Sequence, residues 1–281
     1  MRPRTLPAAV APVLVGSALA WHDHSLQVAP AALALAFALL VQIGTNFAND
    51  YFDFVRGADT AARVGPRRAV AAGLVTPATM RRAMIGVFAA AFLTGLGLIA
   101  WGGPWLLAIG LASITSGYLY TGGPWPLAYV GLGDVFVFFF FGLVAVGGTY
   151  FVQTGKLVPD AVLAGVPIGL LAANILVVNN YRDLDTDRAA NKRTLAVRFG
   201  RGAARAQFIA SLVIAFAMPF WFWRRGYGVT CFLPLAAAPI AWLQVRRLRP
   251  TAVAPELIAL LGAAGKLLAL YAVLFAIGVS V

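Results

Sequence analysis

The sequence predicts an all-α fold, a polytopic membrane bundle of about nine transmembrane helices with a cytoplasmic N-terminus. Of its 281 residues, 61% are hydrophobic and only 11% are charged, whereas soluble domains carry roughly 25% charged residues. Apolar stretches long enough to cross a hydrocarbon core of ~30 Å recur along the whole chain. We therefore expect residues 1–281 to form a single integral-membrane domain.

Nine apolar segments are candidate membrane spans, and several are short or interrupted by glycine and proline. Their expected limits are 5–21, 28–53, 82–101, 104–120, 132–153, 160–181, 203–222, 228–245 and 256–280. The first apolar run follows two arginines but shows no convincing cleavage site, so we expect it to be retained as a helix.

The basic residues gather in alternate loops and predict the orientation. One side carries Arg2, Arg4, Arg56, Arg63, Arg67, Arg68, Arg81, Arg82, Arg182, Arg188, Lys192, Arg193, Arg198, Arg201, Arg205, Arg246, Arg247 and Arg249. The other side has only Lys156, Arg224 and Arg225. The positive-inside rule then places the N-terminus in the cytoplasm and the C-terminus outside. We expect the protein to lie in the inner (plasma) membrane of the cell. The net charge of +12 thus indicates topology and contact with anionic lipid, not a nucleic-acid partner.

Six of the ten acidic residues lie in two short segments, each where a span meets a basic cytoplasmic loop. In both segments, residues spaced by about one helical turn would share one face of a helix. The first stripe consists of Asn46, Asp50 and Asp53, and the second stripe consists of Asn179, Asp183 and Asp187. Asp185 should point to another side of its helix.

Two carboxylate stripes facing each other would repel unless positive charge lay between them. Carboxylate and amide oxygens suit Mg²⁺, which is commonly shared between protein carboxylates and substrate phosphates. Nearby arginines and Lys192 can contact phosphate oxygens directly. The stripes therefore predict a site for Mg²⁺ and a diphosphate at the cytoplasmic face.

Other interpretations of the charged residues stay open at this point. Asp59 and Asp185 are expected to be solvated and paired with neighbouring arginines at an aqueous helix end. An anion transporter would place its charges nearer the membrane midplane, and a lipid scaffold would have little use for two such stripes. Lys266, deep in the ninth span, is either functional or directed to the interface, where it would be free or paired with Glu256.

Two motifs resemble those of the UbiA superfamily of intramembrane prenyltransferases. They are Asn-x-x-x-Asp-x-x-Asp on the second span and Asp-x-x-x-Asp after the sixth. The resemblance covers essentially the whole chain. Further segments are most similar to the branch of the superfamily that acts in menaquinone synthesis: Arg2-Pro-Arg-Thr-Leu-Pro, Tyr120-Thr-Gly-Gly-Pro124, Gly131-Leu-Gly-Asp134 and Asn191-Lys-Arg-Thr-Leu195. Family members usually have glycine where this chain has Asn191.

The resemblance implies transfer of a polyprenyl group from polyprenyl diphosphate to 1,4-dihydroxy-2-naphthoate, with loss of CO₂ and diphosphate, giving demethylmenaquinone. The alternative is the same chemistry on another aromatic acceptor, of the 4-hydroxybenzoate or homogentisate type. The resemblance also implies that Mg²⁺ is bound by Asn46, Asp50, Asp53, Asp183 and Asp187. The four aspartates are the expected catalytic residues.

The expected substrate contacts follow from the same resemblance. Diphosphate is expected to contact Arg56, Arg63, Arg67, Lys192, Arg193 and Tyr120, and the acceptor to contact Asn180, Asp134 and Lys266. The loop 121–131 has no basic residue, so a hydroxyl of Tyr118, Tyr120 or Tyr129 is expected to serve there. The run 138–141 of phenylalanines is expected to pack in the core or face lipid, or to line a groove for the prenyl chain. The loop 54–80 is a candidate cap over the site.

Overall fold

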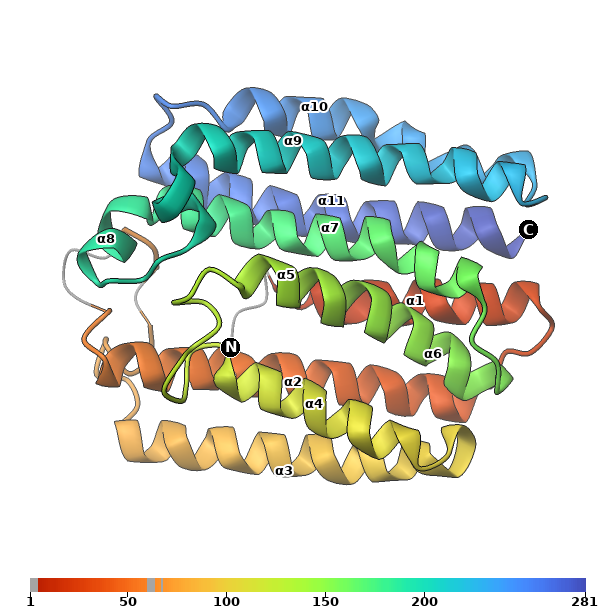
Figure 1. Cartoon of the computed structure of the whole chain (residues 1–281), viewed down its shortest axis with the longest axis horizontal. Coiled ribbons are helices and arrows are strands. Elements are labelled where there is room, and N and C mark those ends of the chain that lie inside the picture. The colour runs from red at the N-terminus through yellow and green to blue at the C-terminus, as the bar shows by residue number, and fades with distance from the viewer. Residues whose placement is uncertain (1–4, 60–63, 67) are drawn as a thin grey trace.

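The computed structural model describes residues 5–59, 64–66 and 68–281, and within these residues all regular secondary structure is helical, with no β-strand (Figure 1). Its α-helices are α1 (Pro7–His22), α2 (Val28–Val55), α3 (Pro77–Gly102), α4 (Trp105–Leu119), α5 (Gly133–Val137), α6 (Ala145–Thr154), α7 (Pro159–Arg182), α8 (Leu184–Ala189), α9 (Leu195–Arg224), α10 (Ala238–Arg247) and α11 (Ala254–Ser280). A π-helical segment η2 (Phe138–Val144) joins α5 to α6, and a 3₁₀ segment η3 (Val229–Ala237) leads into α10.

The predicted all-α membrane fold is confirmed. Seven helical segments in the described part of the chain are long and apolar enough to cross a membrane, and α1 and α4 are shorter apolar helices at two further predicted positions. Whether all nine cross the bilayer, and on which side the N-terminus lies, remain predictions.

Helix α9 begins at Leu195, eight residues before the expected span. The side-chain oxygen of Thr194 accepts a hydrogen bond from the Val197 N–H at 3.3 Å, which caps the helix start. Gly200 then bends the chain with a φ of 84°, a value that favours glycine. The arginines in this first part made it resemble a loop, although they form the aqueous end of the helix.

The helices run side by side, and α8 with the loops that flank it gathers at one end of the bundle (Figure 1). The C-terminus lies at the opposite end. Helix α7 is the most buried of the candidate spans. It packs against η2 through glycine, because a Cβ on Gly142 would lie only 2.5 Å from the carbonyl oxygen of Gly165. This close approach holds η2 directly against α7.

Candidate active site at the polar end of the bundle

A cavity runs through the bundle between α1, α2, α3, α4, η2, α6 and α7. At one end it is lined by Asn49, Asp53, Arg68 and Lys192, and the apolar end includes Leu98, Leu106 and Val152. The lining residues of α2 extend from Ala34 to Asp53, which is about 28 Å at the helical rise of 1.5 Å per residue. The cavity thus joins a charged mouth to an apolar interior, and the two together extend almost the depth of a hydrocarbon core.

The first stripe meets an arginine that the predicted site did not include. Arg68 lies 2.5 Å from Asp53 and 3.3 Å from Asp59, and it also donates a hydrogen bond to the backbone carbonyl of Asn49. Burial alone would lower the pKa of Arg68, but the carboxylates of Asp53, Asp59 and Asp50 outweigh it and raise that pKa. The guanidinium therefore stays charged and neutralises the stripe from the loop side.

The side chain of Asp59 is fully buried in its pair with Arg68. The expectation that Asp59 is solvated was therefore wrong, although the expected arginine partner is present. The cause is Arg68, which returns to the end of α2, where it contacts Asn49 and pairs with Asp59.

Asp50 is the least neutralised carboxylate of the first stripe. Its Oδ2 accepts a hydrogen bond from the Ala69 N–H at 3.2 Å, whereas its buried Oδ1 has no hydrogen-bond partner within the described chain. The Asn46 amide faces the Thr5 hydroxyl at 3.3 Å. A buried oxygen without a donor fits a cation or a metal-bound water as its missing partner.

The second stripe lies where α7 ends and α8 begins. Asp183 forms two hydrogen bonds with Arg182, at 2.7 and 2.6 Å, and Arg182 also donates to the Asn179 oxygen at 2.9 Å. Asp187 is buried and lies 3.7 Å from the ammonium of Lys192. Asp185 points away, as expected, and its side chain is 71% exposed and paired with Arg201 at 2.9 Å.

Tyr129, in the loop between α4 and α5, links the first stripe to the segment that follows the second stripe. Its hydroxyl donates to Asp53 at 2.8 Å, and its carbonyl accepts the Arg193 N–H at 2.9 Å. Arg56 and Lys192 lie 5.3 and 5.5 Å from the centre of its ring. Burial, followed by the charge of Asp53, raises the pKa of Tyr129 well above its usual range. Of the three tyrosines considered for this loop, Tyr129 contacts Asp53 of the first stripe, and Tyr120 lines the cavity.

Asn191 occupies the position at which members of the family that this chain resembles usually have glycine. Its φ is 54°, in the left-handed region that asparagine tolerates better than most residues. The turn allows the Lys192 N–H to bond to the Asp187 carbonyl at 2.8 Å. Lys192 is thereby held beside the second stripe.

The structure gathers some of the predicted contact residues and not others. Arg56 is exposed and donates to the Gly123 carbonyl, and the side chain of Arg193 is exposed. Arg63 and Arg67 lie outside the described residues. Glu256 pairs with Arg249 at 3.4 Å.

The three residues expected to bind the acceptor do not line the cavity. Asn180 and Asp134 are buried elsewhere, with Asp134 3.2 Å from the Gln207 amide, and Lys266 is exposed on the outside of α11. Sequence spacing cannot distinguish a polar residue that faces a cavity from one that faces a neighbouring helix.

Among the described residues, no group of three or more carboxylate, histidine or cysteine side chains is close enough to hold a metal alone. The aspartates instead pair individually with Arg68, Arg182 and Lys192. Such a donor set fits Mg²⁺ only as a shared ion, because Mg²⁺ commonly takes one or two carboxylates and completes its shell with phosphate oxygens and water.

Comparisons with known proteins agree with this architecture. The model of the UbiA prenyltransferase family matches residues 9–261. The chain is 42% identical over 240 residues to a 1,4-dihydroxy-2-naphthoate octaprenyltransferase of Mycobacterium tuberculosis, covering 85% of this chain and 81% of that protein. It is 38% identical over 271 residues to the protein of the same name from Escherichia coli, covering 92% and 87%.

Solved structures share the fold. A UbiA homolog from Aeropyrum pernix K1 superposes with a TM-score of 0.75 at 18% identity, covering 95% of this chain and 96% of that one. A UbiA homolog from Archaeoglobus fulgidus bound to DMAPP and Mg²⁺ superposes with a TM-score of 0.62 at 17% identity, covering 95% and 98%.

Proposed function

Because this chain belongs to the UbiA prenyltransferase family, we propose that it transfers a polyprenyl group from polyprenyl diphosphate to 1,4-dihydroxy-2-naphthoate. Diphosphate and CO₂ are released, and the immediate product is the quinol form of demethylmenaquinone. The printed names of the relatives from M. tuberculosis and E. coli support this acceptor.

The observation that carries the proposal is the cavity itself. One continuous space is lined by carboxylate, guanidinium and ammonium groups at one end and mostly by apolar side chains over the rest. A polyprenyl diphosphate has the same division, with an anionic head and a long apolar tail. Its head belongs beside Asp53, Arg68 and Lys192, and its tail in the membrane-spanning part of the cavity.

Mg²⁺ is proposed as the cofactor, supported by the A. fulgidus homolog with bound Mg²⁺ and by the buried Oδ1 of Asp50. Asp50, Asp53, Asp183 and Asp187 would hold it together with phosphate oxygens, and Asn46 is a further candidate ligand. When bound, Mg²⁺ stabilises negative charge on a leaving diphosphate as a Lewis acid.

The protein's own groups stabilise the departing charge and exclude water. Lys192 and Arg68 line the charged mouth and Arg56 lies near it on the Tyr129 ring, and these cations would donate to phosphate oxygens. Arg63, Arg67, Arg193 and Tyr120 remain proposed contacts. The allylic C–O bond breaks, and its electron pair leaves with diphosphate. The apolar walls keep water from the resulting cation.

The acceptor ring then completes the transfer. The ring carbon that bears the carboxylate attacks the prenyl cation and forms the new C–C bond. Loss of CO₂ returns the electron pair of the broken C–C bond to the ring and restores its aromaticity. We place this reaction at the cytoplasmic face of the plasma membrane, where the basic end of the bundle would lie.

The test uses purified protein with geranylgeranyl diphosphate, Mg²⁺ and a panel of aromatic acids, with products identified by mass spectrometry. The panel contains 1,4-dihydroxy-2-naphthoate labelled in its carboxyl carbon, 4-hydroxybenzoate and homogentisate. We expect a prenylated naphthalene diol without the label. Retention of the label, or prenylation of another acid only, would overturn the assigned acceptor while leaving the family unchanged.

A further inference from the structure

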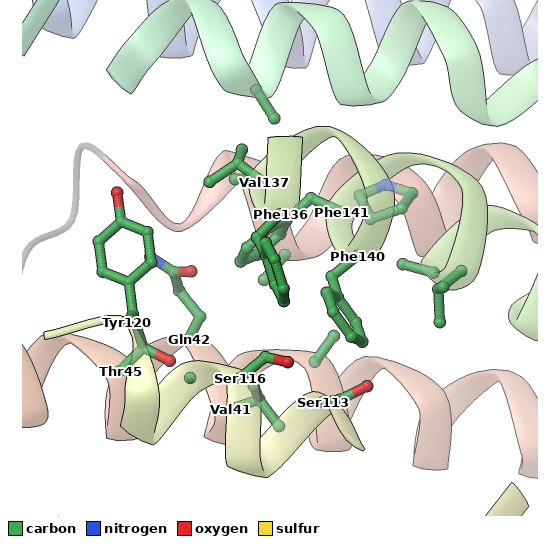
Figure 2. A pocket seen from close by; sticks show the side chains of 18 of the residues that line it. Val41, Gln42, Thr45, Ser113, Ser116, Tyr120, Phe136, Val137, Phe140 and Phe141 are labelled. Carbon is green, nitrogen blue, oxygen red and sulfur yellow. The ribbon is translucent and has the colours of Figure 1, made fainter. Parts of the chain in front are cut away.

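The cavity contains a group of polar side chains within its apolar part. Gln42, Thr45 and Ser116 line it on α2 and α4, opposite the apolar side chains of η2 (Figure 2). Gln42 is only 7% exposed, and burying an amide in a membrane-spanning helix is costly unless its hydrogen bonds are satisfied. These side chains are not used by the proposed diphosphate site.

Thr5 fixes the orientation of the Gln42 amide. The Nε2 of Gln42 donates to the Thr5 hydroxyl oxygen at 2.9 Å, and the Nδ2 of Asn46 approaches the same oxygen at 3.3 Å. With its nitrogen turned to Thr5, the Gln42 amide presents its carbonyl oxygen Oε1 as an acceptor. Within the described chain, the Gln42 side chain makes this one hydrogen bond through its nitrogen, which leaves Oε1 without a protein donor. Figure 2 shows the Gln42 side chain at the Tyr120 end of the pocket.

Gln42 lies at a suitable depth for the second substrate. It precedes Asp53 by eleven residues on α2, which places it about 16 Å deeper along the helix axis. Under the proposed function, the diphosphate would lie next to Asp53, and the reacting carbon of the prenyl group would follow it. An aromatic ring beside that carbon would reach the level of Gln42 with its polar substituents.

We propose that Gln42, held by Thr5, is the acceptor subsite, and that its Oε1 accepts a hydrogen bond from a ring hydroxyl of the aromatic substrate. This inference rests on the proposed function and specifies which residues recognise the hydroxyarene. A hydrogen bond from the ring hydroxyl also increases electron density on the ring, which favours attack on a cation. Gln42 and Thr5 line the cavity, whereas the residues expected from the family resemblance to contact the acceptor, Asn180, Asp134 and Lys266, do not.

The test measures binding through the intrinsic fluorescence of naphthoates, without prenyl diphosphate. Three ligands are titrated into full-length protein: 1,4-dihydroxy-2-naphthoate, 1-hydroxy-2-naphthoate and 4-hydroxy-2-naphthoate. In the wild type, loss of the recognised hydroxyl should weaken binding about 10-fold. In Gln42→Leu, 1,4-dihydroxy-2-naphthoate should bind about 10-fold more weakly than it does to the wild type. Its affinity should then equal that of the mono-hydroxy ligand that lacks the recognised hydroxyl.

Two further variants keep the test decisive. Ser113→Ala is the matched control, because Ser113 lines the same cavity but donates to the Ile109 carbonyl of its own helix at 2.8 Å; its diol affinity should not change. Thr5→Val releases the Gln42 amide and should weaken diol binding by a smaller factor. If Gln42→Leu does not fold, the diol affinity of Thr5→Val decides the test.

The possible outcomes separate the two proposals. An unchanged diol affinity in the folded variants overturns the subsite. If wild-type protein prenylates the diol and Gln42→Leu still discriminates the ligands, only this inference fails. If wild-type protein does not prenylate the diol at all, the proposed function fails first.

Discussion

The guanidinium of Arg68 lies 2.5 Å from the carboxylate of Asp53, and both side chains are almost completely buried. Asp53 is on a membrane-spanning helix and Arg68 is in the following loop, so this ion pair fastens the loop over the charged mouth of the cavity. It also supplies the positive charge without which Asp53 and Asp59 would repel.

The first prediction is that Arg68→Gln lowers both turnover and stability. Removing one partner of a buried ion pair leaves an uncompensated charge, at a cost of about 3–5 kcal/mol. Added Mg²⁺ can supply part of the missing charge, so it should raise the melting temperature of Arg68→Gln more than that of the wild type. Differential scanning fluorimetry in detergent measures this shift.

The exposed Arg81, on the same end of the bundle, provides the control. Arg81→Gln should melt like the wild type at every Mg²⁺ concentration. An equal Mg²⁺ response in wild type and Arg68→Gln would show that Arg68 does not balance the metal-binding carboxylates.

The second prediction concerns the phenol of Tyr129. Because burial and Asp53 raise its pKa in the folded protein, it keeps its proton where an unfolded tyrosine, with a pKa of about 10, ionises. This group therefore contributes stability below pH 10, and that stability is lost as pH rises above 10. The melting temperature should fall less between pH 9 and 11 in Tyr129→Phe than in the wild type. Parallel curves for the two proteins would contradict the buried contact with Asp53.

The third prediction tests the close packing of α7 against η2. Gly142→Ala would place a methyl group 2.5 Å from the backbone oxygen of Gly165, which cannot move aside as a side chain can. We expect a loss of about 1–3 kcal/mol, seen as a lower melting temperature. Gly86→Ala in α3 is the control, since nothing lies within 4 Å of its added Cβ. Similar melting of the two variants would count against the glycine contact.

Helical spacing explains which parts of the site could be predicted. A period of 3.6 residues separates the buried Asp183 and Asp187 from the exposed Asp185. Hydropathy likewise located every candidate span, although the arginine-rich start of α9 was missed. Both features depend on local sequence alone.

The parts that were missed depend on contacts between distant segments. Arg68 follows an irregular loop, and no periodic pattern indicates that it returns to Asp53 or buries Asp59. Its position beside two other predicted contacts, Arg63 and Arg67, was the only signal. Gln42 was overlooked because the local sequence does not show whether an amide within an apolar segment faces a cavity.

The fourth prediction is the topology. Most basic residues of the described chain lie in α8 and at helix termini near it, such as the ends of α7 and α10, and the C-terminus lies at the other end of the bundle (Figure 1). By the positive-inside rule, a reporter fused after Val281 should read periplasmic, and one inserted near Gly65 should read cytoplasmic. Two cytoplasmic readings would require an even number of crossings and would contradict nine spans.

The last prediction separates metal ligands from structural charges. Asp50→Asn, Asp53→Asn, Asp183→Asn and Asp187→Asn each keep the side-chain shape but remove the charge that a metal–diphosphate complex needs. Each should lower turnover at saturating Mg²⁺ by at least ~100-fold, the loss typical of a key electrostatic contact in the transition state. Asp185→Asn should cost much less, because its side chain is exposed and contacts Arg201.

Melting temperatures distinguish loss of chemistry from loss of structure. Asp53→Asn and Asp183→Asn break the pairs with Arg68 and Arg182, so these variants should also be less stable. Asp50→Asn is the sharpest probe, since its described contact is the Ala69 N–H, which the amide oxygen can still accept. It should therefore melt close to the wild type while losing activity. An active Asp50→Asn variant, or one that is inactive only because it unfolds, would remove Asp50 from the proposed metal site.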